Sequence, residues 1–160
     1  MKVFAQNFRG FKEVELDLEK ITLLVGDNSS GKSSLLHLVD SVLRNGLYFA
    51  PVLSPEMGVG SYDYFSPYFK YADVLFGYQT EVDHGSVCKI ISVRKGRDKP
   101  PRIAKCTYLI GRTLISLKRR GTTIQGRVTR VDSSPNIKGV IEHHYEETGF
   151  KSWEIGRAHV

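Results

Sequence analysis

Eight consecutive residues constrain what this chain can fold into more than any other feature. The stretch from Gly26 to Ser33 reads GDNSSGKS and fits the pattern G-x-x-x-x-G-K-[ST] at every fixed position. Gly26 and Gly31 allow the backbone to curl so that successive N–H groups point inward and no Cβ blocks a phosphate. Lys32 is then expected to reach the β- and γ-phosphates of a nucleotide, and the Ser33 hydroxyl to bind Mg²⁺.

The flanking residues predict the strand and the helix that a phosphate-binding loop requires. Residues 21–25 (ITLLV) form a short apolar, partly β-branched run that is typical of a buried strand. Behind the loop, apolar residues at helical spacing predict a helix that begins near Lys32 and ends at Asn45-Gly46; they are Leu35, Leu36, Leu38, Val39, Val42 and Leu43. The helix N-terminus adds unpaired N–H groups and the positive end of a dipole. The pattern therefore favours a nucleotide site over an ordinary glycine-rich turn.

Composition excludes several other classes of protein. A chain of 160 residues that is 41% hydrophobic and 25% charged is long enough for one globular domain with a core. No apolar run approaches the ~20 residues that cross a bilayer, and the N-terminus turns polar too early for a signal peptide. Cys88 and Cys106 fit neither a disulfide framework nor a metal-ligand spacing. We therefore expect buried, reduced thiols in a cytoplasmic protein that has no membrane partner.

Two further strands are predicted ahead of the loop. Residues 2–7 form the first, and residues 8–11 turn the chain. Residues 13–18 (EVELDL) alternate acidic and apolar side chains without a break, which predicts one solvated and one buried face.

This opening resembles the start of an ABC-type ATPase head. The resemblance rests on residues 7–12 (NFRGFK), on the alternating strand, and on residues 24–34 (LVGDNSSGKSS). Asn28 and Ser30 within the loop resemble the form of the SMC, RecF and OLD-like group, whose members are often described as AAA-family ATPases. The likeness covers about the first 45 residues and fades beyond them.

The resemblance implies an α/β P-loop NTPase fold, in which antiparallel strands surround the strand–loop–helix unit. It implies ATP and Mg²⁺ as cofactors, with Lys32 and Ser33 as catalytic residues, and a homodimer in which two heads sandwich ATP. The implied nucleotide-binding residues are Gly26, Asp27, Asn28, Ser29, Ser30, Gly31, Lys32, Ser33, Ser34 and, by the resemblance alone, Arg9. Gln79 is a candidate for the glutamine that senses Mg²⁺ and the attacking water in related ATPases. The alternative interpretation of Gln79 is an exposed loop residue.

The rest of the chain predicts an aromatic-rich insertion over 47–85 and a β-meander over 86–150. Eight aromatic residues fall between positions 62 and 78, but the only basic residue there is Lys70. Core packing is therefore favoured over a base-stacking platform. Four runs with strand patterns, 87–93, 103–108, 113–117 and 122–131, are separated by turn signals at 98–101, 111–112 and 120–121, with a last one at 133–136. We predict an antiparallel meander with its Lys and Arg on exposed faces and turns.

The meander carries most of the positive charge. Between Lys89 and Arg130 there are 13 Lys and Arg and one acidic residue, Asp98. This basic block fits a nucleic-acid footprint, with DNA as the partner, and it equally fits a solvated sheet whose cations protect strand edges. The histidines at 37, 84, 143 and 144 lack acid or Cys at ligand spacing, which favours core or surface roles over a metal site.

Two motifs of an ABC-type head are missing from the sequence. After Lys32 no apolar run ends in Asp-Glu, and no Leu-Ser-Gly-Gly-like signature occurs. We therefore expect residues 1–154 to be part of a longer ATPase head, with residues 1–46 as its loop unit, and the isolated chain to hydrolyse ATP negligibly. Residues 155–160 (IGRAHV) match a translated sequencing-library adapter and are expected to be read-through.

Three functions follow from the sequence. The leading hypothesis is ATP binding and, in the full-length protein, ATP hydrolysis coupled to DNA processing, repair or phage defence. The second is a P-loop kinase or another phosphotransferase. The acidic-apolar hairpin before the loop speaks against it, because kinases commonly begin directly with the strand that leads into the loop. The third is a non-enzymatic nucleic-acid-binding β-domain.

Overall fold

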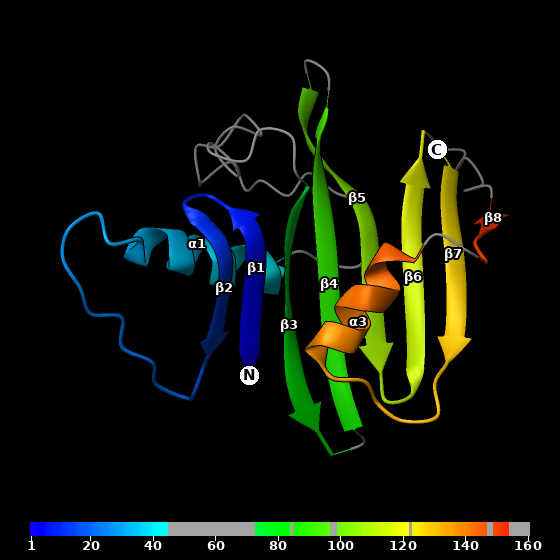
Figure 1. The fold of residues 1–160 in the computed structure, drawn as a ribbon, viewed down its shortest axis with the longest axis horizontal. Coiled ribbons are helices and arrows are strands. Elements are labelled where there is room, and N and C mark those ends of the chain that lie inside the picture. Colours follow the sequence, from blue (N-terminus) through cyan, green and yellow to red (C-terminus); the bar gives the residue numbers. More distant parts are fainter. Residues whose placement is uncertain (45–72, 84, 97–98, 122, 147–148, 154–160) are drawn as a thin grey trace, which may run out of the picture.

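A computed structural model describes residues 1–44, 73–83, 85–96, 99–121, 123–146 and 149–153 (Figure 1). One eight-stranded antiparallel sheet organises these residues, with the strand order β2-β1-β3-β4-β5-β6-β7-β8. The strands are β1 (Lys2–Phe8), β2 (Phe11–Asp17), β3 (Val74–Val82), β4 (Gly85–Gly96), β5 (Lys99–Ile110), β6 (Thr113–Arg120), β7 (Thr123–Arg130) and β8 (Lys151–Trp153). The helices are α1 (Lys32–Arg44) and α3 (Ile137–Tyr145).

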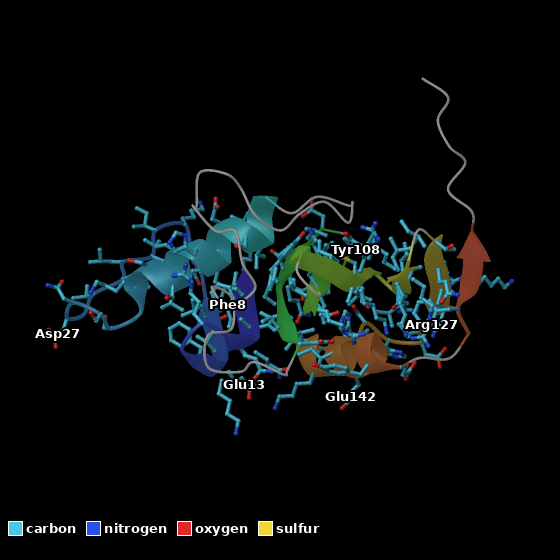
Figure 2. All side chains as sticks on the ribbon, turned by 90° about the horizontal axis from the view of Figure 1, so that it is seen from above. Phe8, Glu13, Asp27, Tyr108, Arg127 and Glu142 are labelled. Atoms are coloured by element: carbon cyan, nitrogen blue, oxygen red, sulfur yellow. The ribbon has the colours of Figure 1, made fainter. Side chains whose placement is uncertain are left out.

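The two helices lie on opposite faces of the sheet, as the view from above shows (Figure 2). Successive side chains of β1 point to opposite faces of the sheet. Val3 and Ala5 belong to the cluster under α1, whereas Phe4 belongs to the cluster under α3. Leu38 and Val42 of α1 are buried in the first cluster, and Val140 of α3 is buried in the second. The chain is therefore an antiparallel-sheet α/β domain with few helices.

Most of the predicted strands and the first helix are confirmed. β1 and β2 form with a turn at Arg9 and Gly10, and β4 to β7 form the predicted meander. The predicted buried face of residues 13–18 is only half-buried, because β2 is an edge strand. In α1, Leu36 and Leu43 are exposed although the apolar pattern includes them. The predicted aromatic insertion up to residue 72 and the tail 155–160 lie outside the described residues.

Two predictions for the second half of the chain are wrong. Residues 99–101 belong to β5 rather than to a turn; the irregular β4–β5 pairing between Arg94 and Gly96 accommodates Pro100 and Pro101, which lack an N–H for a regular ladder. The helix α3 was not predicted. The sequence signal for α3 is Asn136 together with the apolar residues at helical spacing that follow it. The Asn136 side chain caps the helix by accepting a hydrogen bond from Gly139 N (3.0 Å).

Some cations of the basic block are buried, which corrects the prediction that they lie on exposed faces. Lys89 and Lys105 are 6% and 7% exposed. The Lys105 ammonium donates to the backbone carbonyls of His144 and Glu146 at the C-terminal end of α3. Arg127 donates to the carbonyl of His143 (3.3 Å) and pairs with the Glu146 carboxylate (3.0 Å). These cations stabilise the helix because they face the negative end of its dipole.

The predicted burial of both cysteines is confirmed. Cys88 and Cys106 are free and lie in the clusters under α3 and under α1. Burial raises the pKa of the Cys88 thiol to about 12 and that of Cys106 to about 11. Both are therefore protonated, unreactive thiols at neutral pH. Among the described residues, no helix is long and apolar enough to cross a membrane.

A polar network lies beneath α3. His144 of α3 is 2% exposed. The Nδ1 atom of His144 lies 2.9 Å from Thr107 Oγ1, and Thr107 Oγ1 lies 3.0 Å from Ser116 Oγ. Burial, and secondarily the charge of Lys105, lowers the pKa of His144 to about 3. His144 is therefore neutral in the folded protein over the physiological pH range.

The buried neutral histidine makes stability depend on pH. Below the unfolded-state pKa of about 6.5 the unfolded chain takes up a proton that the folded chain cannot, so the free energy of unfolding should fall as pH decreases. From about pH 6.5 to pH 5 we expect the wild type to lose roughly 2 kcal/mol from this group. Urea unfolding of the wild type and of His144→Asn measures the difference in slope. A wild-type slope in His144→Asn would contradict the assignment.

One glycine of β3 has no room for a side chain. A Cβ at Gly77 would lie 1.9 Å from the Lys89 carbonyl oxygen of β4 and 3.0 Å from the Phe4 ring. We expect Gly77→Ala to lower the free energy of unfolding by roughly 2–3 kcal/mol, since the strands must separate. The control is Gly10→Ala, where a Cβ meets nothing within 4 Å. Thermal unfolding followed by circular dichroism should separate the two variants, and equal melting temperatures would refute this packing.

Candidate functional site

The predicted phosphate loop is a curled segment that leads directly into α1. Ser29 and Gly31 both have positive φ, 66° and 95°, so the backbone turns sharply on either side of Ser30. Ser30 N donates to the Asp27 carbonyl (3.3 Å), and Leu35 N donates to the Gly31 carbonyl (3.0 Å). Figure 2 places Asp27 at the outer end of the molecule, beyond the N-terminus of α1.

The Lys32 side chain folds back over this loop. Its ammonium donates to the carbonyl oxygens of Gly26 (2.6 Å) and Asp27 (2.5 Å) and lies 3.3 Å from Ser30 Oγ. The loop therefore holds a full positive charge against its own backbone. The neighbouring Ser33 is exposed at the start of the helix.

The β1–β2 hairpin packs against the junction of loop and helix. Arg9 lies in the hairpin turn with φ 52°, and its Nη1 donates to Ser34 Oγ (3.2 Å). The ring of Phe11 covers Gly31, where a Cβ would lie 2.8 Å from Phe11 Cζ. Arg9 is expected at the loop only by resemblance, and no role is predicted for Phe11. The structure brings both residues next to the loop. Position 31 therefore needs a glycine for two reasons: its positive φ, and the Phe11 ring that leaves no room for a Cβ.

Two cations lie beside the start of α1, and the loop itself contributes one carboxylate, Asp27. The first turn of α1 contains no acidic residue, and Arg9 and Lys32 both lie beside it. Burial lowers the pKa of Arg9 without discharging it. Burial, and then the charge of Arg9, lowers the pKa of His37 one turn further along, so His37 is neutral at pH 7. The positive end of a helix dipole and nearby cations both favour a bound anion. The arrangement suits a phosphate.

The candidate metal ligands are not gathered in one place. Among the described residues, no group of three or more His, Cys, Asp or Glu is arranged to hold a metal ion. Mg²⁺ at the loop would therefore depend on the Ser33 hydroxyl together with water and phosphate oxygens, which fits its preference for oxygen ligands. Gln79 lies in β3, half-buried, and donates to Ser86 Oγ (2.8 Å). It is a sheet residue rather than an exposed loop residue, and its amide is engaged within the sheet.

The predicted buried strand over residues 21–25 is wrong. The segment has no regular secondary structure and belongs to no sheet, and Ile21, Leu23 and Val25 are 91%, 83% and 83% exposed. After Leu18, whose N–H donates to the Met1 carbonyl (2.7 Å), the chain leaves the edge of the sheet. A strand needs a neighbour that pairs with its backbone, and none of the described strands lies alongside this segment.

The packing of Phe11 on Gly31 predicts a local defect in one variant. We expect Gly31→Ala to lower the free energy of unfolding by roughly 1–3 kcal/mol, because it places a side chain at positive φ and forces it against the ring. In a Phe11→Leu background the same change should cost less, since only the backbone strain remains. Urea unfolding of the four proteins gives the coupling, and a cost that is independent of residue 11 would rule out the contact.

Comparison with known families completes the description of the site. The model of the AAA ATPase domain matches residues 1–105, about two thirds of the chain, which include the loop, α1 and the strands from β1 into β5. No curated protein and no solved structure gives a significant match. The curled loop at the start of α1 lies within the matched residues. The chain therefore belongs to the AAA ATPase domain family, whose members are ATP-binding ATPases.

Proposed function

We propose that residues 26–33 bind the triphosphate of ATP, with the loop amides and Lys32 as the phosphate ligands. The observation that carries this proposal is the position of the Lys32 ammonium, which lies against the loop carbonyls at the N-terminus of a helix without acidic residues in its first turn. A phosphate that enters the loop exchanges those carbonyls for charged oxygens as partners of Lys32. Bonds between charged groups are the stronger kind, so the exchange favours binding.

Residues in and beside the loop other than Lys32 contribute charge to the site or hold the loop in place. The Ser33 hydroxyl would hold Mg²⁺, which would neutralise charge on the phosphate oxygens. Arg9 adds a second positive charge through its contact with Ser34. Phe11 packs against Gly31, whose positive φ lets the chain curl into the loop. Lys32 and these amides stabilise the charge that develops on the phosphoryl oxygens during transfer.

We infer that hydrolysis needs residues that this sequence does not contain. After Lys32 it has neither an apolar run that ends in Asp-Glu nor a signature motif. The exposed apolar segment 21–25 offers a backbone edge and a hydrophobic surface that a further strand would cover. Both observations support an ATPase head of the SMC, RecF and OLD-like group that is completed outside these residues. In such a protein two heads sandwich ATP, and hydrolysis drives work on DNA.

The fold also bears on the alternative of a P-loop kinase. The hairpin of β1 and β2 precedes the loop, and Arg9 and Phe11 of that hairpin contact it. A kinase commonly begins with the strand that leads into the loop, so it has no need for such a support. The hairpin therefore favours the ATPase over a phosphotransferase.

The proposal predicts which lysine controls nucleotide affinity. We expect Lys32→Ala to weaken binding of ATP with Mg²⁺ at least tenfold, equivalent to about 1.4 kcal/mol, because the charged partner of the phosphates is lost. Titration of the 160-residue chain with a fluorescent ATP analogue measures the affinity. The matched control is Lys12→Ala, an exposed lysine of the same hairpin that lies outside the loop.

Binding to DNA, measured in parallel, separates the alternatives. Loss of ATP binding in Lys32→Ala while DNA binding persists supports the proposed ATPase. Absence of ATP binding in both the wild type and Lys32→Ala, with DNA binding in both, would instead favour a non-enzymatic β-domain. Equal ATP affinity of the wild type and Lys32→Ala would overturn the assignment of the loop.

A further inference from the structure

The outer side of β2 is an unpaired strand edge. In the part of the chain that the structure describes, β2 pairs with β1 alone. Met1 and Leu18, just beyond the paired residues, exchange both backbone hydrogen bonds, at 3.0 and 2.7 Å. In an antiparallel ladder only every second pair is bonded in this way. The alternation therefore leaves three residues of β2 whose N–H and C=O groups point away from β1, namely Glu13, Glu15 and Asp17.

The same three residues carry their side chains on one face of the sheet. Glu15 lies opposite Phe4, which belongs to the cluster under α3. Since side chains alternate along a strand, Glu13 and Asp17 share that face, and all three acids are exposed. Figure 2 shows Glu13 on the side of the sheet that carries α3. Among the described residues, Lys2 is the cation that pairs with them, at 2.5 Å from Glu15 and 3.9 Å from Asp17. Three carboxylates beside one ammonium leave this edge acidic.

The opposite face of β2 is apolar and incompletely covered. Val14 and Leu16 lie on the α1 face and are half-buried. Val14 and the following residue on that face, Leu18, pack against the cluster under α1. A strand added beside β2 would cover these side chains with its own apolar residues. The two faces together therefore specify an added strand in which basic residues alternate with apolar ones, the basic residues lying opposite the three acids.

A second copy of this chain does not meet that specification. Pairing of β2 with β2 of another copy would place acid opposite acid, because outward-pointing residues pair with one another, and like charges in opposite positions destabilise a sheet. The strands that carry the basic block, β4 to β7, have a neighbour on each side within the sheet. Among the described residues, a second copy therefore has no basic strand with a wholly free edge. The acids protect the edge against self-association and leave it open to a basic partner.

We propose that the outer edge of β2 binds an extended segment of another protein, in which basic and apolar residues alternate. The segment adds a ninth strand to the sheet. The outward N–H and C=O groups of Glu13, Glu15 and Asp17 supply the main-chain bonds, and their carboxylates select the basic side chains. The site is separate from the phosphate loop and does not rest on the function proposed for it.

A fluorescently labelled peptide of alternating Lys and Val, titrated with the 160-residue chain, tests the edge by fluorescence anisotropy. Glu13→Gln removes one carboxylate and should weaken binding about threefold. Glu13→Pro also removes an outward N–H while leaving the bonds to β1 intact, and should weaken binding about tenfold. The matched control is Glu142→Gln, an exposed acid of α3, which should bind as the wild type does.

N-methylated peptides test the backbone contact on the wild-type chain, whether or not Glu13→Pro folds. Residues directly opposite each other share a face, so the Lys residues of the peptide exchange backbone bonds with the acids of β2. Methylation of the Lys amides should abolish binding, and methylation of the Val amides should leave it unchanged. Equal effects of the two methylated peptides, equal losses in Glu13→Gln and Glu142→Gln, or no saturable binding by the wild type would overturn the proposal.

Discussion

The pairing of β1 with β3 is the constraint on which the rest of the structure depends. It joins two strands separated by more than 60 residues in sequence and thereby attaches the hairpin of β1 and β2 to the meander. The same pairing builds the cluster in which α1 packs, since Val3 and Ala5 meet Phe76 there. Asn7 fixes the end of the pairing through its bond to the Asp73 carbonyl (3.2 Å). The loop is therefore held by one helix and one hairpin, both of which need this contact.

Positive charge has two different uses in this fold. At the loop, Lys32 and Arg9 lie near the positive end of α1, where Lys32 donates to loop carbonyls and Arg9 to Ser34. At the other helix the charges are arranged in the opposite sense, because Lys105 and Arg127 face the negative end of α3. Part of the basic block is thus required by the fold itself.

Local patterns predicted the elements whose signals are contained in their own residues. The alternation along β2, the strand patterns of the meander and the helical spacing after Lys32 each predicted the right element. The prediction for residues 21–25 failed because an apolar run does not by itself reveal whether a partner strand is present. The prediction of a turn at Pro100 and Pro101 failed because the irregular pairing of β4 with β5, which accommodates the two prolines, cannot be deduced from the local sequence. The helix α3 was missed, although Asn136 and the residues that follow it carried its signal.

By itself the sequence determined that residues 26–31 form a loop that leads into a helix at Lys32 and that both cysteines are buried, because glycine placement and local hydrophobicity act over a few residues. Only the tertiary structure decided that Arg9 and Phe11 contact the loop, that α1 and α3 cover opposite faces, and that Lys105 lies opposite Lys118. These contacts join residues that are far apart in the chain, and their geometry follows from strand order and register. Neither the strand order nor the register can be deduced from the composition or spacing of any single segment.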